Sequence, residues 1–305
     1  MTKRDVVSAI DFTNGWMMEI FRSTDELREE IEEKRVLEYA RGRFMVTLFT
    51  EPSTRTRLSF TLAMKRLGGE VIDFGTEEVS SIAKGESLED TVRTIDGYDP
   101  DVMVIRSKDV GAAKIAAELT DASVINAGDG WNEHPTQALL DVYTIQKVIG
   151  KIDGIRVAIM GDLRYGRTAS SLSYVLSKFK DVKVHYVAPP ELQIREEVIS
   201  RLSGVEYEFH DRIEDIEEPL DVLYVTRVQW ERIPDRTLVD RLRGSYMVTP
   251  ALLRKLPKIP IILHPLPRLS ELPKEIDRLP EAKYFDQAKN GIYVRAALLR
   301  YVLGV

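Results

Sequence analysis

The sequence contains no cysteine, only 4 histidines and no long uncharged apolar run. Without cysteine the chain forms no disulfide, no thiolate metal site and no cysteine nucleophile, and it needs no oxidising compartment to fold. Its first residues are charged and polar where a secretory signal needs an apolar core. We therefore expect a cytoplasmic protein with no membrane anchor. The few histidines limit imidazole catalysis and histidine-rich metal sites to a short list.

A large excess of either charge is also lacking, because 43 Lys and Arg stand against 49 Asp and Glu, for a net charge of -6. General nucleic-acid binding and binding to anionic membranes need excess positive charge, so both are disfavoured. Any anion must be bound by a local basic cluster. The 305 residues, 44% of them apolar, are enough for two domains with their own cores.

Nine short runs rich in β-branched and aromatic residues alternate with segments of helical period. The runs are 43–50, 70–75, 101–107 and 122–128 in the first half and 155–162, 182–189, 205–211, 221–228 and 259–265 in the second. This alternation predicts an α/β protein of two domains, each a mostly parallel sheet flanked by helices, with the active site in the cleft between the domains.

We place the domain boundary at the helix that starts at His134, since both halves have enough strands to close a core. The final helical segment follows a completed second sheet and still carries an apolar face, so we expect it to return to the first domain. The predicted domains are 1–133 plus 287–305 and 134–286.

The strongest chemical signal is the segment 52–57, where an apolar strand runs directly into an amphipathic helix. Ser53 is a good N-cap, and the first helical N–H groups behind it lack partners at the positive end of the helix. Two threonine hydroxyls and the guanidiniums of Arg55 and Arg57 add donors suited to phosphate. The segment predicts an anion site; the alternative is a capped helix with a solvated basic first turn.

Polar residues follow two further strands of the first half. His134 and Gln137 open a helix after the strand 122–128, and Arg106 ends the strand 101–107. Ligands of open α/β sheets bind beyond the carboxyl ends of strands. These side chains could therefore face the same crevice as Arg55, although a helix start that happens to contain histidine remains an alternative.

The segment 161–168 has the spacing of a phosphate-binding P-loop, but we reject that reading. The P-loop lysine is absent, and Asp162 puts a negative charge where backbone N–H groups must hold phosphate. Arg167 instead lies at a strand-to-helix turn, and Arg227 and Gln229 follow another strand. Two arginines indicate a ligand with two carboxylates, unless they form ion pairs with nearby acidic residues.

The run 259–265 ends in a rigid turn in which Pro265 and Pro267 flank Leu266. Proline removes backbone donors and leaves carbonyl acceptors exposed. Such carbonyls suit an amide NH2 group, although a turn of this kind, taken alone, is more often purely structural.

Taken in order, the motifs STRTR, HPTQ, GDLRYGRT, TRVQ and HPLPR resemble those of aspartate carbamoyltransferase catalytic chains, within the wider aspartate/ornithine carbamoyltransferase superfamily. The first two motifs are shared with ornithine enzymes, and the later ones indicate aspartate. An ornithine enzyme typically has cysteine at the position of Pro265. Arg167 and Arg227 would also repel the cationic side chain of ornithine.

The resemblance implies a role for each motif residue in transferring a carbamoyl group to aspartate, a step of de novo pyrimidine biosynthesis. The phosphate of carbamoyl phosphate would be bound by Ser53, Thr54, Arg55, Thr56 and Arg106. The carbonyl oxygen would be bound by Arg106, His134 and Thr56, and the NH2 group by Gln137 and the carbonyls of Pro265 and Leu266. The carboxylates of aspartate would be bound by Arg167, Arg227 and Gln229.

The resemblance also implies a homotrimer with shared active sites, in which Ser80 and Lys84 reach into the neighbouring subunit's site. Ser80 would contact carbamoyl phosphate, with Ser81 as the alternative, and Lys84 would contact both substrates. No metal, cofactor or covalent intermediate is needed, because positioning and charge stabilisation carry the reaction. A separate regulatory chain, nucleotide control and the identity of the proton acceptor stay open.

Other functions remain to be tested against this one. The nearest is a carbamoyltransferase for another amino acceptor such as ornithine. An ATP-dependent kinase that uses 161–168 is a second alternative, and a non-enzymatic phosphate or dicarboxylate binding protein is a third.

Overall fold

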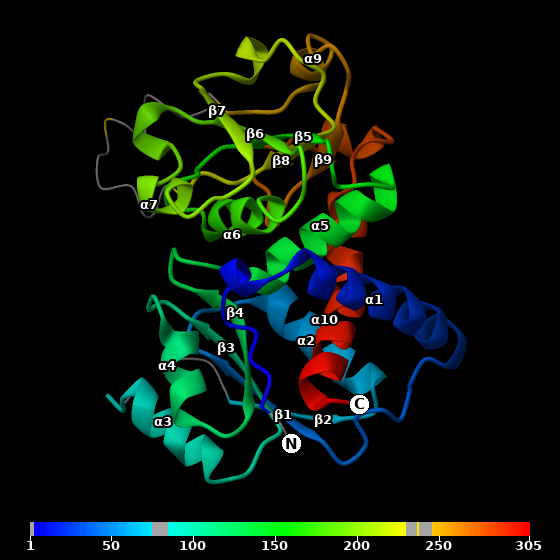
Figure 1. Cartoon of the computed structure of the whole chain (residues 1–305), viewed down its shortest axis with the longest axis vertical. Helices are drawn as coiled ribbons and strands as arrows, with labels where there is room; N and C mark the ends of the chain where they lie inside the picture. The colour runs from blue at the N-terminus through cyan, green and yellow to red at the C-terminus, as the bar shows by residue number, and fades with distance from the viewer. Residues whose placement is uncertain (1–2, 75–84, 230–236, 238–245) are drawn as a thin grey trace. The chain divides into compact units, whose positions relative to one another are not determined.

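The computed structural model describes residues 3–74, 85–229, 237 and 246–305. The chain divides into two compact units (Figure 1). Unit 1 comprises residues 1–139 and 290–305, and unit 2 comprises residues 140–289. Among the described residues, no helix is both long and apolar enough to cross a membrane.

Unit 1 is built on a four-stranded parallel sheet in the order β2-β1-β3-β4. Its strands are β1 Phe44–Phe49, β2 Glu70–Asp73, β3 Val102–Ser107 and β4 Ser123–Asp129. Each coincides with a run that the sequence predicted as a strand, except that β4 ends one residue beyond its run. Both faces of such a sheet are covered, so the central strands β1 and β3 are buried almost throughout, and the edge strand β4 is buried as well.

The helices of unit 1 cover both faces of this sheet. They are η1 Ala9–Asp11, α1 Asn14–Lys34, α2 Thr54–Arg66, α3 Leu88–Asp96 and α4 Ala112–Leu119. Figure 1 shows α3 and α4 on one face and α2 with part of α10 on the other. Alternate strand residues such as Val46, Leu48 and Met103 pack with Val92 of α3 and Ala116 of α4 in one buried cluster.

Unit 2 is built on a five-stranded parallel sheet in the order β7-β6-β5-β8-β9. Its strands are β5 Arg156–Met160, β6 Lys183–Val187, β7 Glu206–His210, β8 Val222–Val225 and β9 Ile261–Leu263. All five fall in predicted runs. The edge strand β7 is mostly exposed, whereas β5 and β8 are almost fully buried.

Short helices connect the strands of unit 2. They are α6 Arg167–Leu176, η3 Pro190–Leu192, α7 Glu196–Ile199, η4 Ile213–Asp215, α9 Pro250–Leu253 and η6 Lys274–Arg278. Two longer helices, α5 Pro135–Ile149 and α10 Tyr284–Leu303, contribute residues to both units. Within unit 1, Arg295 of α10 donates to Ser59 Oγ of α2 at 2.8 Å.

Parallel strands end at the same edge of a sheet. The segment 50–53, Arg106 and His134 follow or end β1, β3 and β4, which are consecutive neighbours in unit 1. Arg167, Arg227 and Pro265 follow β5, β8 and β9, which are consecutive neighbours in unit 2. The fold therefore gathers the predicted site residues into one group in each unit.

Candidate active site

The sequence predicts an anion site in the segment between β1 and α2. Ser53 is the N-cap of α2 by backbone conformation, but its side chain makes no capping hydrogen bond. Its hydroxyl therefore does not satisfy the N–H groups of the first helical turn. Thr54 is exposed and Thr56 is buried beside it. Hydroxyls and unsatisfied N–H groups lie together at the positive end of a helix.

Arg55 and Arg57 have different environments, although the sequence counted both as anion donors. Arg57 donates to Asp73 Oδ2 at 3.1 Å and lies over the Phe49 ring at 5.2 Å. Within the described part of the chain, Arg55 forms no hydrogen bond or ion pair. By surface area Arg55 is exposed, yet the protein around its guanidinium lowers its pKa by desolvation. Arg55 is therefore the available anion donor of the two, and Arg57 is a structural residue.

Arg106 is held rigidly at the end of β3. Its Nε lies 3.1 Å from Glu51 Oε2, and its NH1 donates to the carbonyl of Ala127 at 3.3 Å. The backbone of Thr50 also pairs with Arg106, with an N to O distance of 2.9 Å. A guanidinium fixed by two neighbouring strands loses little rotamer entropy when it binds a ligand. The sequence did not single out Glu51.

His134 is 4% exposed and lies directly before α5. Its backbone carbonyl accepts hydrogen bonds from the N–H groups of Gln137 and Ala138, at 3.0 and 3.2 Å. Its Nδ1 lies 3.4 Å from Thr136 Oγ1. Proline at the first helical position and these backbone bonds fix His134 and Gln137 on the same helical turn.

Glu133, next to His134, is a buried carboxyl that sequence reasoning missed. Its two oxygens accept hydrogen bonds from Ser8 Oγ at 2.6 Å and from the Ala9 N–H at 2.7 Å. Burial raises its pKa to about 7, although these two hydrogen bonds act in the opposite direction. Glu133 therefore connects the N-terminal segment to the turn that contains His134. The bonded residues are more than a hundred positions apart in the sequence, so no local pattern predicts this contact.

In unit 2 the loop after β5 is wrapped around the buried carboxylate of Asp162. The N–H groups of Tyr165 and Gln229 donate to its two oxygens at 2.9 and 3.1 Å. A side chain at Gly161 would meet the Thr226 carbonyl at 2.2 Å, and the φ of Gly161 is +123°. Because the protein's own carboxylate takes these N–H groups, the loop is not a phosphate cradle.

Arg167 and Arg227 lie at the ends of neighbouring strands in unit 2. Arg167 is the first residue of α6, and Arg227 follows β8, which pairs with β5 from Val157↔Val222 to Met160↔Val225. Both side chains are half-buried. The Gln229 side-chain amide, which the sequence placed on a substrate carboxylate, donates to the Tyr165 carbonyl at 2.8 Å.

The turn after β9 is held by a buried histidine. The Leu266 N–H donates to His264 Nδ1 at 2.8 Å, so the ring proton is on Nε2, which lies 3.0 Å from Glu271 Oε1. Leu266 has a φ of +53°, and the Leu266–Pro267 peptide bond is cis. These contacts fix the directions of the Pro265 and Leu266 carbonyls. Ser80 and Lys84 lie outside the described residues.

The chain matches two family models in succession. Residues 4–147 match the carbamoyl-P binding domain of aspartate/ornithine carbamoyltransferases, and residues 153–302 match their Asp/Orn binding domain. It is 49% identical over 304 residues to the aspartate carbamoyltransferase catalytic subunit of Methanopyrus kandleri, covering 99% of this chain and 97% of the relative.

Two solved structures extend the similarity to the fold. The catalytic subunit of M. jannaschii aspartate transcarbamoylase is 45% identical, with a TM-score of 0.89 and 98% of each chain covered. The aspartate transcarbamoylase of Trypanosoma cruzi in complex with N-(phosphonacetyl)-L-aspartic acid is 37% identical, with a TM-score of 0.91. The match covers 97% of this chain and 94% of that one.

Proposed function

The chain belongs to the aspartate/ornithine carbamoyltransferase family, and we propose that it transfers the carbamoyl group of carbamoyl phosphate to the amine of L-aspartate. The products are N-carbamoyl-L-aspartate and phosphate, in de novo pyrimidine biosynthesis. The observation that carries this proposal is the segment after β1, where Arg55 lies beside the N-terminus of α2 and forms no hydrogen bond or ion pair with any residue that the structure describes. It lies in the part that matches a carbamoyl-phosphate binding domain.

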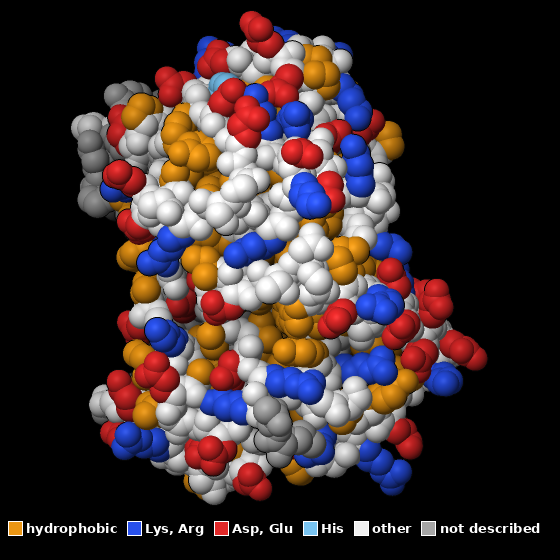
Figure 2. Space-filling view, viewed as in Figure 1, with side chains coloured by type: hydrophobic (Ala, Val, Ile, Leu, Met, Phe, Trp, Pro, Cys, Tyr) orange, Lys and Arg blue, Asp and Glu red, His pale blue; other side chains and the backbone are white. Residues whose placement is uncertain are grey.

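The phosphate of the first substrate binds to residues of unit 1. Ser53, Thr54 and the first N–H groups of α2 receive the phosphate, and the Arg55 guanidinium neutralises it. We assign this role to residues 1–133 and 287–305, and aspartate binding to residues 134–286. Acidic and basic side chains are interspersed over the face in Figure 2. Selection of the anion therefore rests on these local donors rather than on a broad basic surface.

The carbamoyl group is polarised by donors that are already oriented. Arg106, held by Glu51 and Ala127, and His134, buried before α5, donate to its carbonyl oxygen together with Thr56. Fixed donors stabilise the developing oxyanion without reorganising during the reaction.

The NH2 group of the carbamoyl moiety donates to Gln137 and to the carbonyls of Pro265 and Leu266. The His264 and Glu271 contacts set the directions of these two carbonyls. Because only an NH2 donor matches several acceptors at once, this arrangement selects carbamoyl phosphate over acyl phosphates that lack the amide.

Aspartate binds through Arg167, Arg227 and Gln229 in unit 2. Two guanidiniums can each hold one carboxylate bidentately, and they would repel the side-chain ammonium of ornithine. The neutral amine attacks the carbamoyl carbon, a tetrahedral oxyanion forms, and the C–O bond to phosphate breaks. The departing phosphate accepts the amine proton.

The working enzyme is a cytoplasmic homotrimer in this proposal. Ser80 and Lys84 of one subunit complete the site of its neighbour, with Ser80 on carbamoyl phosphate and Lys84 on both substrates. The absence of cysteine supports a reducing compartment. Whether a separate regulatory chain joins the trimer is a question for the purified assembly.

A colorimetric ureido assay tests the reaction directly. The full-length protein, incubated with carbamoyl phosphate and either aspartate or ornithine, should give ureido product at least about a hundredfold faster with aspartate, because a buried unfavourable charge contact costs several kcal/mol. The Arg55→Ala protein, purified in parallel, controls for contaminating enzymes. Citrulline as the main product would favour the ornithine alternative. Binding of both substrates without product would favour a binding protein.

A further inference from the structure

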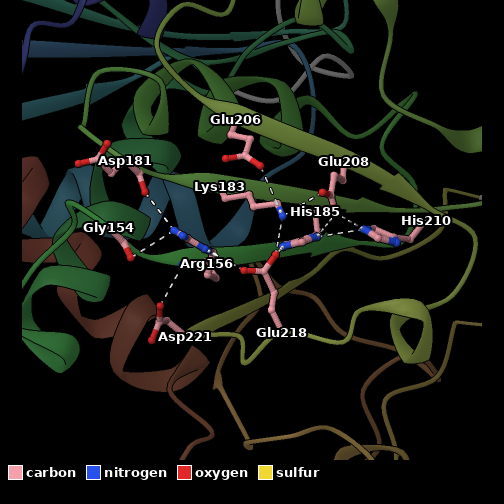
Figure 3. Close-up of polar contacts among 10 residues, drawn as sticks. All are labelled: Gly154, Arg156, Asp181, Lys183, His185, Glu206, Glu208, His210, Glu218 and Asp221. Atoms are coloured by element: carbon pink, nitrogen blue, oxygen red, sulfur yellow. Dashed lines mark hydrogen bonds and ion pairs between the residues drawn. The ribbon is translucent and has the colours of Figure 1, made fainter.

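Unit 2 carries a second cluster of ionisable side chains, which takes no part in the proposed reaction. The cluster lies on one face of the neighbouring strands β6 and β7 (Figure 3). In this parallel pair Lys183 lies opposite Glu206, His185 opposite Glu208, and Val187 opposite His210. Because strand side chains alternate between faces, five of these side chains share one face: Lys183, His185, Glu206, Glu208 and His210.

Three atoms of this cluster form a triangle of the size that a tetrahedral metal ion requires. His185 Nδ1 and His210 Nε2 are 3.0 Å apart, and Glu208 Oε2 lies 3.6 Å from the first and 3.5 Å from the second. Ligands about 2.0–2.1 Å from a tetrahedral zinc ion are about 3.4 Å apart. The three atoms are therefore spaced like one face of such a coordination sphere.

The remaining polar atoms of two of these ligands are already held by neighbouring charges. His185 Nε2 lies 3.2 Å from Glu218 Oε1, so a ring proton on Nε2 faces a carboxylate, and in that tautomer the Nδ1 lone pair faces His210. Lys183 Nζ lies 2.9 Å from Glu208 Oε1, the oxygen that does not face the histidines. A carboxylate behind a ligating histidine is the usual support of protein zinc sites.

The supporting carboxylate is itself fixed. Glu218 accepts from Lys183 Nζ at 2.6 Å and from Arg156 Nε of β5 at 2.9 Å. The cluster contains three carboxylates, from Glu206, Glu208 and Glu218. It contains two cationic side chains, Lys183 and Arg156. With neutral histidines it is left with one net negative charge, which favours an added cation.

We propose that His185, Glu208 and His210 bind one Zn²⁺ ion, with a water molecule as the fourth ligand. Two imidazole nitrogens and one carboxylate suit zinc better than Mg²⁺ or Ca²⁺, which prefer oxygen ligands throughout. Glu208 is 46% exposed, so an ion can enter from solvent. The ion joins the exposed edge strand β7 to β6 and stabilises unit 2.

Metal titration of the full-length protein tests the site. After removal of metals with a chelator, the protein is titrated with Zn²⁺ against a chromophoric chelator and with Co²⁺ by absorption spectroscopy. We expect one equivalent of tightly bound Zn²⁺ per chain, with a dissociation constant below about 1 µM. The Co²⁺ protein should show the intense visible bands of tetrahedral coordination, and Zn²⁺ should raise the midpoint of thermal unfolding.

Matched variants separate this site from adventitious binding. Glu208→Gln and His210→Gln should each weaken Zn²⁺ binding at least about a hundredfold, whereas Glu206→Gln, on the same face but not a ligand, should keep it. Carbamoyl transfer shows that each variant is folded. The proposal is wrong if the wild-type protein binds no Zn²⁺ in this range, or if both ligand variants bind it as tightly as Glu206→Gln. In that case the two rings simply share a hydrogen bond between His210 Nε2 and His185 Nδ1.

Discussion

In unit 1 the segment after β1, where we propose that the phosphate binds, has no side-chain capping bond at the start of α2, whereas in unit 2 the loops after β5 and β9 are held by buried polar side chains. Ser53 begins α2 without a side-chain capping bond, and Arg55 extends with no partner among the described residues. In unit 2, the Asp162 carboxylate accepts hydrogen bonds from the N–H groups of Tyr165 and Gln229. His264 accepts from the Leu266 N–H and so fixes that turn.

This difference fits the proposed roles of the two units, phosphate binding in unit 1 and dicarboxylate binding in unit 2. In unit 1 the Ser53 hydroxyl makes no capping bond, and Arg55 forms no hydrogen bond or ion pair with the described residues, so a phosphate can accept from both. In unit 2 the polar groups that shape the loops are satisfied internally, and Arg167 and Arg227 project from a preorganised frame. Substitutions at the donors of unit 1 should therefore remove ligand contacts directly. Substitutions at the buried residues that shape the loops of unit 2 should instead displace the groups that contact the ligand.

The largest effect should come from Arg55→Ala. Loss of one positioned donor to a developing charge costs about 3 kcal/mol, so we expect kcat/KM to fall at least about a hundredfold. The matched control is Arg57→Ala, since Arg57 is paired with Asp73 and stacked on Phe49. Steady-state kinetics should show that Arg57→Ala keeps activity within about threefold. Equal losses in the two variants would remove the distinction that we draw between these arginines.

Next in size should be Arg167→Gln. A hydrogen-bonded charge pair contributes about 1.5–3 kcal/mol, so the KM for aspartate should rise about tenfold to a hundredfold while the KM for carbamoyl phosphate changes little. Arg164→Gln is the control, because Arg164 lies exposed in the same loop. If the two KM values rose together, the assignment of separate substrates to separate units would fail.

A smaller effect should follow from Glu271→Ala. The variant leaves His264 Nε2 buried without its carboxylate partner and loosens the turn that orients the Leu266 carbonyl. If the misoriented carbonyl stabilises the transition state by about 1 kcal/mol less, kcat falls about fivefold. Glu271→Gln retains an oxygen acceptor and should recover most of the rate. A variant whose thermal unfolding changes while kcat does not would show that Glu271 is structural only.

The smallest effect concerns the pH dependence of stability in unit 1. The pKa of Glu133 is raised to about 7, so in the folded protein it keeps a proton that the unfolded chain releases above its ordinary value near 4.5. The contribution of Glu133 to stability therefore decreases as pH rises from about 4.5 to about 7.

Glu133→Gln cannot ionise; its amide oxygen can still accept from the Ala9 N–H, and its NH2 group can donate to Ser8 Oγ. Free energies of unfolding in urea at pH 5.5 and pH 8 should differ less in this variant than in the wild-type protein. Because the other titrating groups are common to both proteins, the difference isolates Glu133. An identical pH dependence would contradict the assigned pKa.

The strands and the order of the site segments could be predicted from the sequence because both are local signals. The nine strands of the described residues coincide with the runs rich in β-branched and aromatic residues, and the fold places Arg55, Arg106 and His134 at or just after the ends of three neighbouring strands. Once parallel sheets are inferred, the carboxyl-end rule groups these residues without further information.

The supporting contacts could not be predicted, because they join residues far apart in sequence. Nothing near Arg57 signals its pairing with Asp73, and nothing near Glu133 signals its bonds to the N-terminal segment. The contact between His185 and His210 depends on the register of two strands 25 positions apart, where a shift by one residue would turn every side chain to the other face. Such contacts require the assembled sheet.

The central claim is that unit 1 binds the phosphate and unit 2 binds the dicarboxylate of one reacting pair. A crystal structure of this protein with N-(phosphonacetyl)-L-aspartic acid, the compound bound in the T. cruzi relative, tests it most directly. We predict the phosphonate against Ser53, Thr54 and Arg55 and the two carboxylates against Arg167 and Arg227. A phosphonate bound to the 161–168 loop, or carboxylates bound away from both arginines, would contradict the account.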